Sequence, residues 1–163
     1  PEMIDVGALG KGRIVDIVHD LLGSFGYADR IVDAGGDLRV SGPPIRVALE
    51  HPYDATRAIG VATITDEALC ASATNRRAWP GAHGGLHHVL DARTGEPVRT
   101  YAATWAIAPE AMLADAAATA LFFEGGDAFA HRFGVEWVRM TTDGVVEWSA
   151  RTGPGPNRLE VFA

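Results

Sequence analysis

The run Met112–Phe123 constrains the fold more than any other segment, because it is apolar on nearly every side of a helix. Pro109 precedes it and Gly125 follows it, and these residues favour the first turn and the end of a helix. The sequence therefore predicts a helix from Pro109 to about Phe123. A helix that is apolar all round has to be buried, and a hydrophobic content of 47 % supplies the core that buries it.

The rest of the chain pairs short strands and inserts helices between the pairs. The glycine-rich segment Gly7–Gly12 is interpreted as a loop, with helices predicted at Ile14–Leu22 and Asp127–Phe133. Strands are predicted at Arg30–Ala34, Asp37–Val40, Ile45–Leu49, Ala58–Thr65, Leu86–Asp91, Tyr101–Ala108, Glu136–Thr141 and Val145–Ser149. This order favours an α+β fold with mainly antiparallel sheets and packed helices, and 163 residues correspond to one domain.

Charge and cysteine content exclude several classes of function. The net charge is −7 and the only basic pair is Arg76-Arg77, so no basic stripe for nucleic acid is present. Cys70 is the single cysteine, which excludes an intrachain disulfide, and its apolar neighbours indicate a small core residue instead of a nucleophile. The apolar run at Met112 is too short to cross a bilayer and is interrupted by Asp115.

Asp115 and Thr119 lie four residues apart in the predicted helix, so their side chains share one face. Burying an unpaired carboxylate is costly, which requires a partner for Asp115. Two oxygens on one face suit Mg²⁺, which binds few protein oxygens and keeps waters or substrate phosphates. The alternative is that Asp115 pairs with a buried arginine while Thr119 bonds back to its own helix.

Two glycine-rich segments are candidates for ligand contacts. Gly7–Gly12 contains Lys11 and leads into a helix, as a phosphate site would, although it lacks the Walker A spacing and a plain turn fits as well. In the other segment, Gly35 and Gly36 separate two predicted strands. Asp37 follows them and is either a polar contact to a ligand or the cap of the turn.

His87 and His88 are neighbours on a predicted strand, so only one of them faces a given site. A histidine beside a cleft can act as a general base, and a purely hydrogen-bonding role is the alternative. Asp91, Thr94 and Gly95 are expected to form the turn that closes this strand.

These segments, taken in order, resemble the successive motifs of the ApbE family, the FAD:protein FMN transferases once described as thiamine-biosynthesis lipoproteins. The motifs are specific as an ordered set and cover the chain up to about Phe123. The segments that carry the resemblance are Asp5–Gly12, Asp33–Asp37, Ala68–Ser72, His87–Pro97 and Met112–Leu121.

The resemblance implies an ApbE-like fold and a magnesium-dependent enzyme that transfers FMN from FAD to a Thr or Ser hydroxyl of an acceptor protein, releasing AMP. An alternative is a module that binds FAD, or hydrolyses it to FMN and AMP, without transfer. By position, the metal ligands are Asp115, Thr119 and the carbonyl of Ala8. Lys11 lies near the pyrophosphate, His88 is the base, and the contacts to FAD are Lys11, Gly12, Asp37, Ser72 and His88.

The resemblance also implies which part of the family's domain this chain represents. Residues 1–163 correspond to the C-terminal part of one ApbE-like domain, and the N-terminal part, which supplies much of the FAD pocket, is expected to be absent. The chain alone is then expected to be a poor enzyme that binds FAD weakly. It is also expected to associate with itself, and a homo-oligomer is one form that this association can take. Family members commonly work on the extracytoplasmic side of the membrane as lipoproteins.

Two departures from the family pattern affect the expected site. Ala71–Arg76 stands where the family has Thr-Ser-Gly-Asp-Tyr-Glu, so an acidic and an aromatic contact are missing. Ala92 replaces the proline of the family's Asp-Pro-Arg-Thr-Gly.

Overall fold

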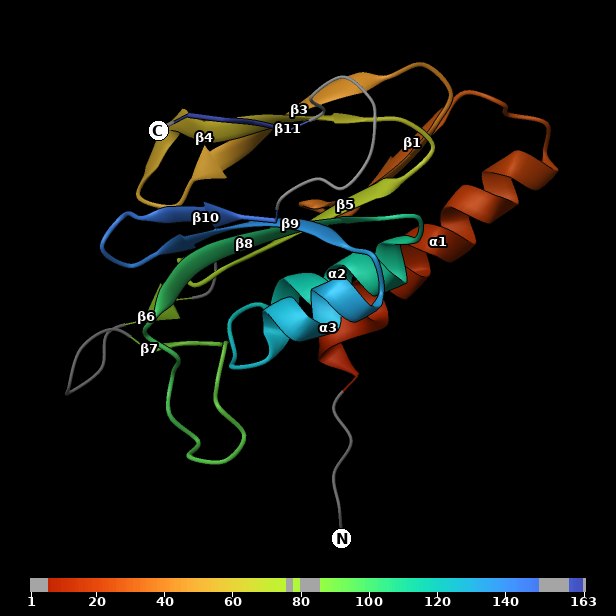
Figure 1. Cartoon of the computed structure of the whole chain (residues 1–163). Helices are drawn as coiled ribbons and strands as arrows, with labels where there is room; N and C mark the ends of the chain where they lie inside the picture. The colour runs from red at the N-terminus through yellow and green to blue at the C-terminus, as the bar shows by residue number, and fades with distance from the viewer. Residues whose placement is uncertain (1–5, 76–77, 80–85, 150–158, 163) are drawn as a thin grey trace, which may run out of the picture.

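The molecule is layered, with helices on one face of a six-stranded sheet and a three-stranded sheet on the other (Figure 1). The computed structural model describes residues 6–75, 78–79, 86–149 and 159–162. Its helices are α1 (Gly7–Ser24), α2 (Ala111–Ala120) and α3 (Gly126–Arg132). Its strands are β1 (Arg30–Asp33), β2 (Asp37–Ser41), β3 (Ile45–His51), β4 (Asp54–Ile64), β5 (Ala68–Ala73), β6 (Ala78–Trp79), β7 (Leu86–His87), β8 (Tyr101–Ala108), β9 (Glu136–Thr141), β10 (Val146–Trp148) and β11 (Leu159–Val161).

Both larger sheets are antiparallel throughout, which confirms the predicted α+β class. The six-stranded sheet has the order β1-β2-β5-β8-β9-β10, and the three-stranded sheet has the order β11-β4-β3. Strands β6 and β7 pair separately as a short ribbon. The central strands β5 and β8 direct some side chains toward the helices and others toward the three-stranded sheet.

Small residues fill the layer between the helices and the large sheet. Ala114, Ala117 and Ala118 of α2 pack on Ala68 and Cys70 of β5, and all five are fully buried. Burial raises the pKa of the Cys70 thiol, which donates to the Ala111 carbonyl at 3.4 Å. Cys70 is therefore a core residue, as predicted.

Large residues fill the layer between the two sheets. Leu49 and Ile64 come from the three-stranded sheet, and Leu69, Trp105 and Met140 come from the other. Alternation along β5 sends Leu69 into this layer and its neighbours Ala68 and Cys70 toward the helices. A single strand thus contributes to two cores of different character.

Several element boundaries differ from the prediction. Gly7–Gly12 is not a loop but the start of α1, because this segment packs closely on α2. Helix α2 begins at Ala111, with Glu110 as its N-cap, so Pro109 lies before the helix. β7 ends at His87, short of the predicted Asp91, and β5 was not predicted as a strand. No helix among the described residues is long and apolar enough to cross a membrane.

Candidate functional site

A cavity of about 500 Å³ opens where α1, α2, the β1–β2 turn, β5 and the segment after β7 meet. It collects residues that lie far apart in the sequence. The predicted site residues that line it are Ala8, Lys11, Ser72, His88, Asp115 and Thr119. Gly12 and Asp37 were predicted as contacts to FAD, but neither lines the cavity.

Asp115 lies on α2 and is the buried carboxylate of the cavity, with 2 % of its surface exposed. Its Oδ2 accepts the backbone N–H of Gly12 at 2.9 Å. The pKa of Asp115 is raised to about 6, chiefly by burial. The hydrogen bond from Gly12 and the positive charge of Lys11 lower this pKa, and the negative charge of Asp37 raises it. Within the described residues, no arginine pairs with Asp115, and the backbone N–H of Gly12 is its hydrogen-bond partner there.

Gly12 is needed for the close approach of α1 to α2. A Cβ at this position would lie 2.3 Å from the carbonyl oxygen of Ala111 and 2.8 Å from Cβ of Asp115. Both distances are too short for any side chain, so only glycine allows its N–H to reach the carboxylate. Gly12 therefore holds Asp115 in place, and its N–H is not directed at the cavity.

Lys11 lies on α1 immediately before Gly12. Its side chain lines the cavity and forms an ion pair with Asp37 of β2. The Asp37 side chain is fully buried, and its Oδ1 has no hydrogen-bond partner among the described residues. Asp37 therefore positions the lysine from behind. The turn-cap alternative for Asp37 is wrong, because Asp33 accepts the N–H of Gly36 at 3.0 Å and caps this turn.

The two histidines have different surroundings. His87 is nearly buried, and its Nδ1 accepts the N–H of Val89 at 3.3 Å. The proton therefore lies on Nε2, which donates to the carbonyl of Val98 at 2.8 Å. His88 is exposed and lines the cavity. Of the two histidines, only His88 lines the cavity, and it lies just after the end of β7 at His87.

The turn after these histidines forms as predicted. The carbonyl of Asp91 accepts the N–H groups of Thr94 and Gly95, at 3.2 and 2.7 Å, and Gly95 has a φ of +73°. The segment Gly81–Gly85, which its glycines predict to be a loop, lies outside the described residues, and so does the basic pair Arg76-Arg77.

Asp16 was not recognised from the sequence, although it supports the whole site. Its two carboxylate oxygens accept the N–H groups of Ala111 and Met112, each at 2.9 Å, and Oδ1 also accepts Arg39 at 2.8 Å. Asp16 therefore caps α2 from the neighbouring helix. The signal was its spacing of four residues from Gly12, which puts both on the face of α1 that contacts α2.

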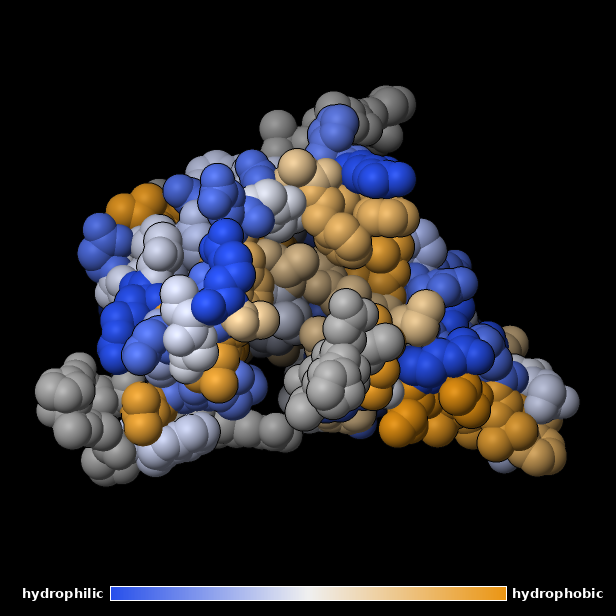
Figure 2. All heavy atoms as spheres, turned by 90° about the horizontal axis from the view of Figure 1, so that it is seen from below, coloured by the Kyte–Doolittle hydropathy of each residue, from blue (hydrophilic) through white to orange (hydrophobic). Residues whose placement is uncertain are grey.

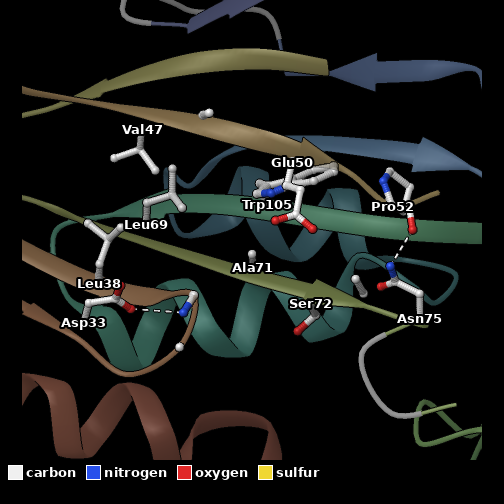
Figure 3. A pocket seen from close by; sticks show the side chains of 14 residues that line it. Asp33, Leu38, Val47, Glu50, Pro52, Leu69, Ala71, Ser72, Asn75 and Trp105 are labelled. Carbon is white, nitrogen blue, oxygen red and sulfur yellow. Dashed lines mark hydrogen bonds between the residues drawn. The ribbon is translucent and has the colours of Figure 1, made fainter. Parts of the chain in front are cut away.

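A second, smaller pocket of about 220 Å³ adjoins the cavity (Figure 3). Gly35, Ala71, Ser72 and Ala73 line both hollows. The second pocket lies between β3 and the large sheet, with Leu38, Leu69 and Trp105 on its apolar side and Glu50 and Ser72 among its polar groups. The cavity thus continues into a slot that has apolar side chains on one side and polar groups on the other.

Comparison with known proteins gives consistent results. A family model described as "ApbE family" matches residues 2–138. The FAD:protein FMN transferase of Rhodobacter capsulatus is 33 % identical over 153 residues, which cover 88 % of this chain and 29 % of the relative. The FAD:protein FMN transferase of Vibrio cholerae is 28 % identical over 163 residues, covering 92 % of this chain and 49 % of the relative.

A solved structure matches as well. The ApbE protein of Thermotoga maritima superposes with a TM-score of 0.81 at 28 % identity, covering 90 % of this chain and 51 % of that chain. The chain therefore spans between 29 % and 51 % of the length of these relatives.

Proposed function

The chain belongs to the ApbE family, and from this premise we propose that it takes part in magnesium-dependent transfer of FMN from FAD to a Thr or Ser hydroxyl of an acceptor protein, with release of AMP. The relatives named FAD:protein FMN transferase support flavin transfer in general. The observation that carries the proposal is the single cavity lined by Lys11, Asp115, Thr119 and His88.

The residues present fit a magnesium ion. Asp115 offers a carboxylate, Thr119 a hydroxyl and Ala8 a backbone carbonyl, and all three line the cavity. Oxygen donors of this kind suit Mg²⁺, which completes its shell with waters and substrate phosphates. Burial raises the pKa of Asp115, and this cost of the charged form is one that a bound cation would offset.

The residues of this chain would then divide the work of phosphoryl transfer. When bound, the metal neutralises charge on the FAD pyrophosphate. The ammonium of Lys11, held by Asp37, binds the pyrophosphate oxygens. The acceptor oxygen forms a bond to the FMN phosphorus as the bond to the AMP oxygen breaks, and His88 takes the proton of the hydroxyl.

We place one ring system of FAD in the slot beside the cavity. Trp105, Leu38 and Leu69 offer the apolar surface that a planar ring requires, and Ser72 connects the slot to the phosphate side. Trp105 is 5 % exposed, so the same side chain closes the sheet–sheet core and lines the slot.

The test is incubation of the purified chain with FAD, Mg²⁺ and an acceptor protein of one of the ApbE relatives. A fluorescent band that stays on the acceptor after acid denaturation, together with AMP in the supernatant, is expected. Asp115→Ala and Asp115→Asn should reduce the rate to that measured without Mg²⁺, and Thr119→Val should weaken Mg²⁺ binding in calorimetry.

Asp127→Ala is the matched control, because Asp127 is an exposed carboxylate on another helix. Full magnesium-dependent activity of Asp115→Ala would overturn the metal assignment. Bound flavin without a labelled acceptor favours the alternative of a binding module, and FMN with AMP but no band favours a hydrolase. From family resemblance alone we also propose that the enzyme works as a lipoprotein on the extracytoplasmic side of the membrane.

A further inference from the structure

The outward face of α1 is an apolar stripe on the surface of the molecule. Ile14, Ile17, Leu21 and Phe25 follow one another at spacings of three and four residues, so they lie along one side of the helix. Their exposed fractions are 62 %, 50 %, 53 % and 72 %. Figure 2 shows hydrophobic side chains gathered over α1 at the lower right.

The stripe is opposite the face of α1 that forms the site. Gly12, Val15, Asp16 and His19 form the buried face, which packs on α2, β1 and β2. Among the described residues, no element covers the other side of the helix, as the exposed fractions show. A contiguous apolar surface of this kind on a folded domain marks an interaction site. The stripe on α1 therefore forms one continuous exposed apolar surface along a single helix.

Charges beside the stripe indicate the occupant. Arg13 and Asp20 lie four residues before and three residues after Ile17, on the same flank of the helix. Arg13 makes no ion pair with another described residue. The Asp20 side chain is 65 % exposed and lies 3.4 Å from Nη1 of Arg39, an exposed contact that leaves it accessible to a second arginine. A stripe with opposite charges four residues before and three residues after its centre is approximately complementary to itself in the antiparallel direction.

We propose that α1 pairs with α1 of a second copy, antiparallel, about a two-fold axis near Ile17. The pairing brings Arg13 of each copy beside Asp20 of the other and stacks Ile14 on Leu21. Parallel pairing would instead place like charges together. Gly10 would face Ser24 of the other copy, and both residues are small enough for the helices to approach closely.

The dimer leaves the cavity residues on the far side of each helix. The proposal is therefore independent of flavin transfer, and failure of one does not imply failure of the other. The closing experiment measures association only.

Sedimentation equilibrium of the full 163-residue chain should give a dimer. Ile17→Asp places a charge at the centre of the seam in both copies, which should raise the dissociation constant at least about 100-fold. Val145→Asp is the matched control, because Val145 is 54 % exposed in the β9–β10 turn, and it should leave the dimer intact. Circular dichroism and Tm verify that each variant is folded.

Arg13→Asp and Asp20→Arg should each weaken the dimer about tenfold, and the double reversal should restore it. A mixture of Gly10→Cys and Ser24→Cys proteins should form a disulfide between copies, since native Cys70 is buried. A monomer at all concentrations overturns the proposal. The stripe would then bind a different polypeptide, such as one that corresponds to the part of the relatives that this chain does not match. A dimer indifferent to Ile17→Asp, or cross-linking of Gly10→Cys to itself, also overturns it.

Discussion

The two packed layers of this molecule are built from residues of opposite size. Small residues such as Ala106, Ala114 and Ala117 fill most of the layer between the helices and the large sheet. Large residues such as Leu49, Ile64 and Trp105 fill the layer between the two sheets. The polar groups follow the same division. Buried residues that contact the helices include Asp16, His19, Asp37, Thr104 and Asp115.

This difference shows how a site can be placed inside a core. Small side chains bring backbones close enough for a carboxylate on one element to reach an N–H on another, as Asp115 does with Gly12 and Asp16 with Ala111. Large side chains keep backbones apart and supply most of the hydrophobic stabilisation. Adding atoms to a side chain in the helix layer should therefore lower the stability of the protein most. In the layer between the sheets, removing atoms should do so.

Gly12→Val should have the largest effect, because it adds atoms where the layer has no room. The Cβ alone would lie 2.3 Å from a backbone oxygen of Ala111, so α1 and α2 would have to separate. We expect a loss of at least about 3 kcal/mol in the free energy of unfolding, or failure to fold. Urea unfolding measures it.

Gly10→Ala is the matched control for Gly12, in the same helix two residues earlier. A Cβ at Gly10 has no atom of a described residue within 4 Å, so alanine should be neutral or stabilise by up to about 1 kcal/mol. If both substitutions have the same effect, helix propensity and not close packing explains Gly12.

The dipeptide His87-His88 sharpens the contrast between packing and chemistry. His88→Ala should slow flavin transfer about 10²–10⁴-fold with little change in FAD affinity, as loss of a general base does. His87→Ala should have the smaller effect on rate and should lower stability, because its ring bonds to Val98 and Val89. Equal effects of the two substitutions on the rate would contradict the assignment of a chemical role to His88 and a structural role to His87. Chromatography of samples quenched at fixed times would measure both rates.

Leu49→Ala tests the large-residue layer by removing atoms. Leu49 is 1 % exposed, and such a truncation costs about 2–5 kcal/mol of stability. Binding of Mg²⁺ should remain unchanged, because Leu49 faces away from the helix layer. Calorimetric titration alongside urea unfolding would show this; a parallel loss of metal affinity would mean that the layers are coupled.

The sequence predicted most of the strands and the class of fold, because hydrophobic alternation and turn residues are local signals. Tyr101–Ala108 was predicted with its observed boundaries. β5 was missed because alanine, cysteine and serine carry no strand preference, and only its place between β2 and β8 makes it central. Tertiary context decided that strand.

The candidate site shows the same limit. Helical spacing predicted that Asp115 and Thr119 lie together, and both line the cavity. The sequence also predicted that His87 and His88 have different surroundings, although β7 ends at His87 and His88 lies beyond the strand. Nothing local indicated that Gly12 belongs to a helix, since glycine is a poor helix former. Its role depends on Ala111, about one hundred residues later, whose carbonyl it approaches. Contacts of that kind are a property of the fold and not of the motif.

Asp115→Asn should change stability less than Leu49→Ala does, and the size of the effect depends on pH. The pKa of Asp115 is raised to about 6 in the folded protein, against about 3.9 in an unfolded chain. Between these values the folded state holds a proton that the unfolded state has lost, so stability falls as pH rises through this window. Above pH 6 the buried charge costs the wild type at most about 3 kcal/mol, since cavity water solvates part of it.

Asparagine removes that cost while its oxygen still accepts the N–H of Gly12. In EDTA, the variant should therefore match the wild type near pH 4 and be more stable at pH 8, as urea unfolding at the two pH values would show. Added Mg²⁺ should reverse the order at pH 8, because a ligand that binds only the folded wild type stabilises it. A difference that does not change with pH would mean that Asp115 stays charged at little cost, and the helix layer would then tolerate charge as readily as the surface does.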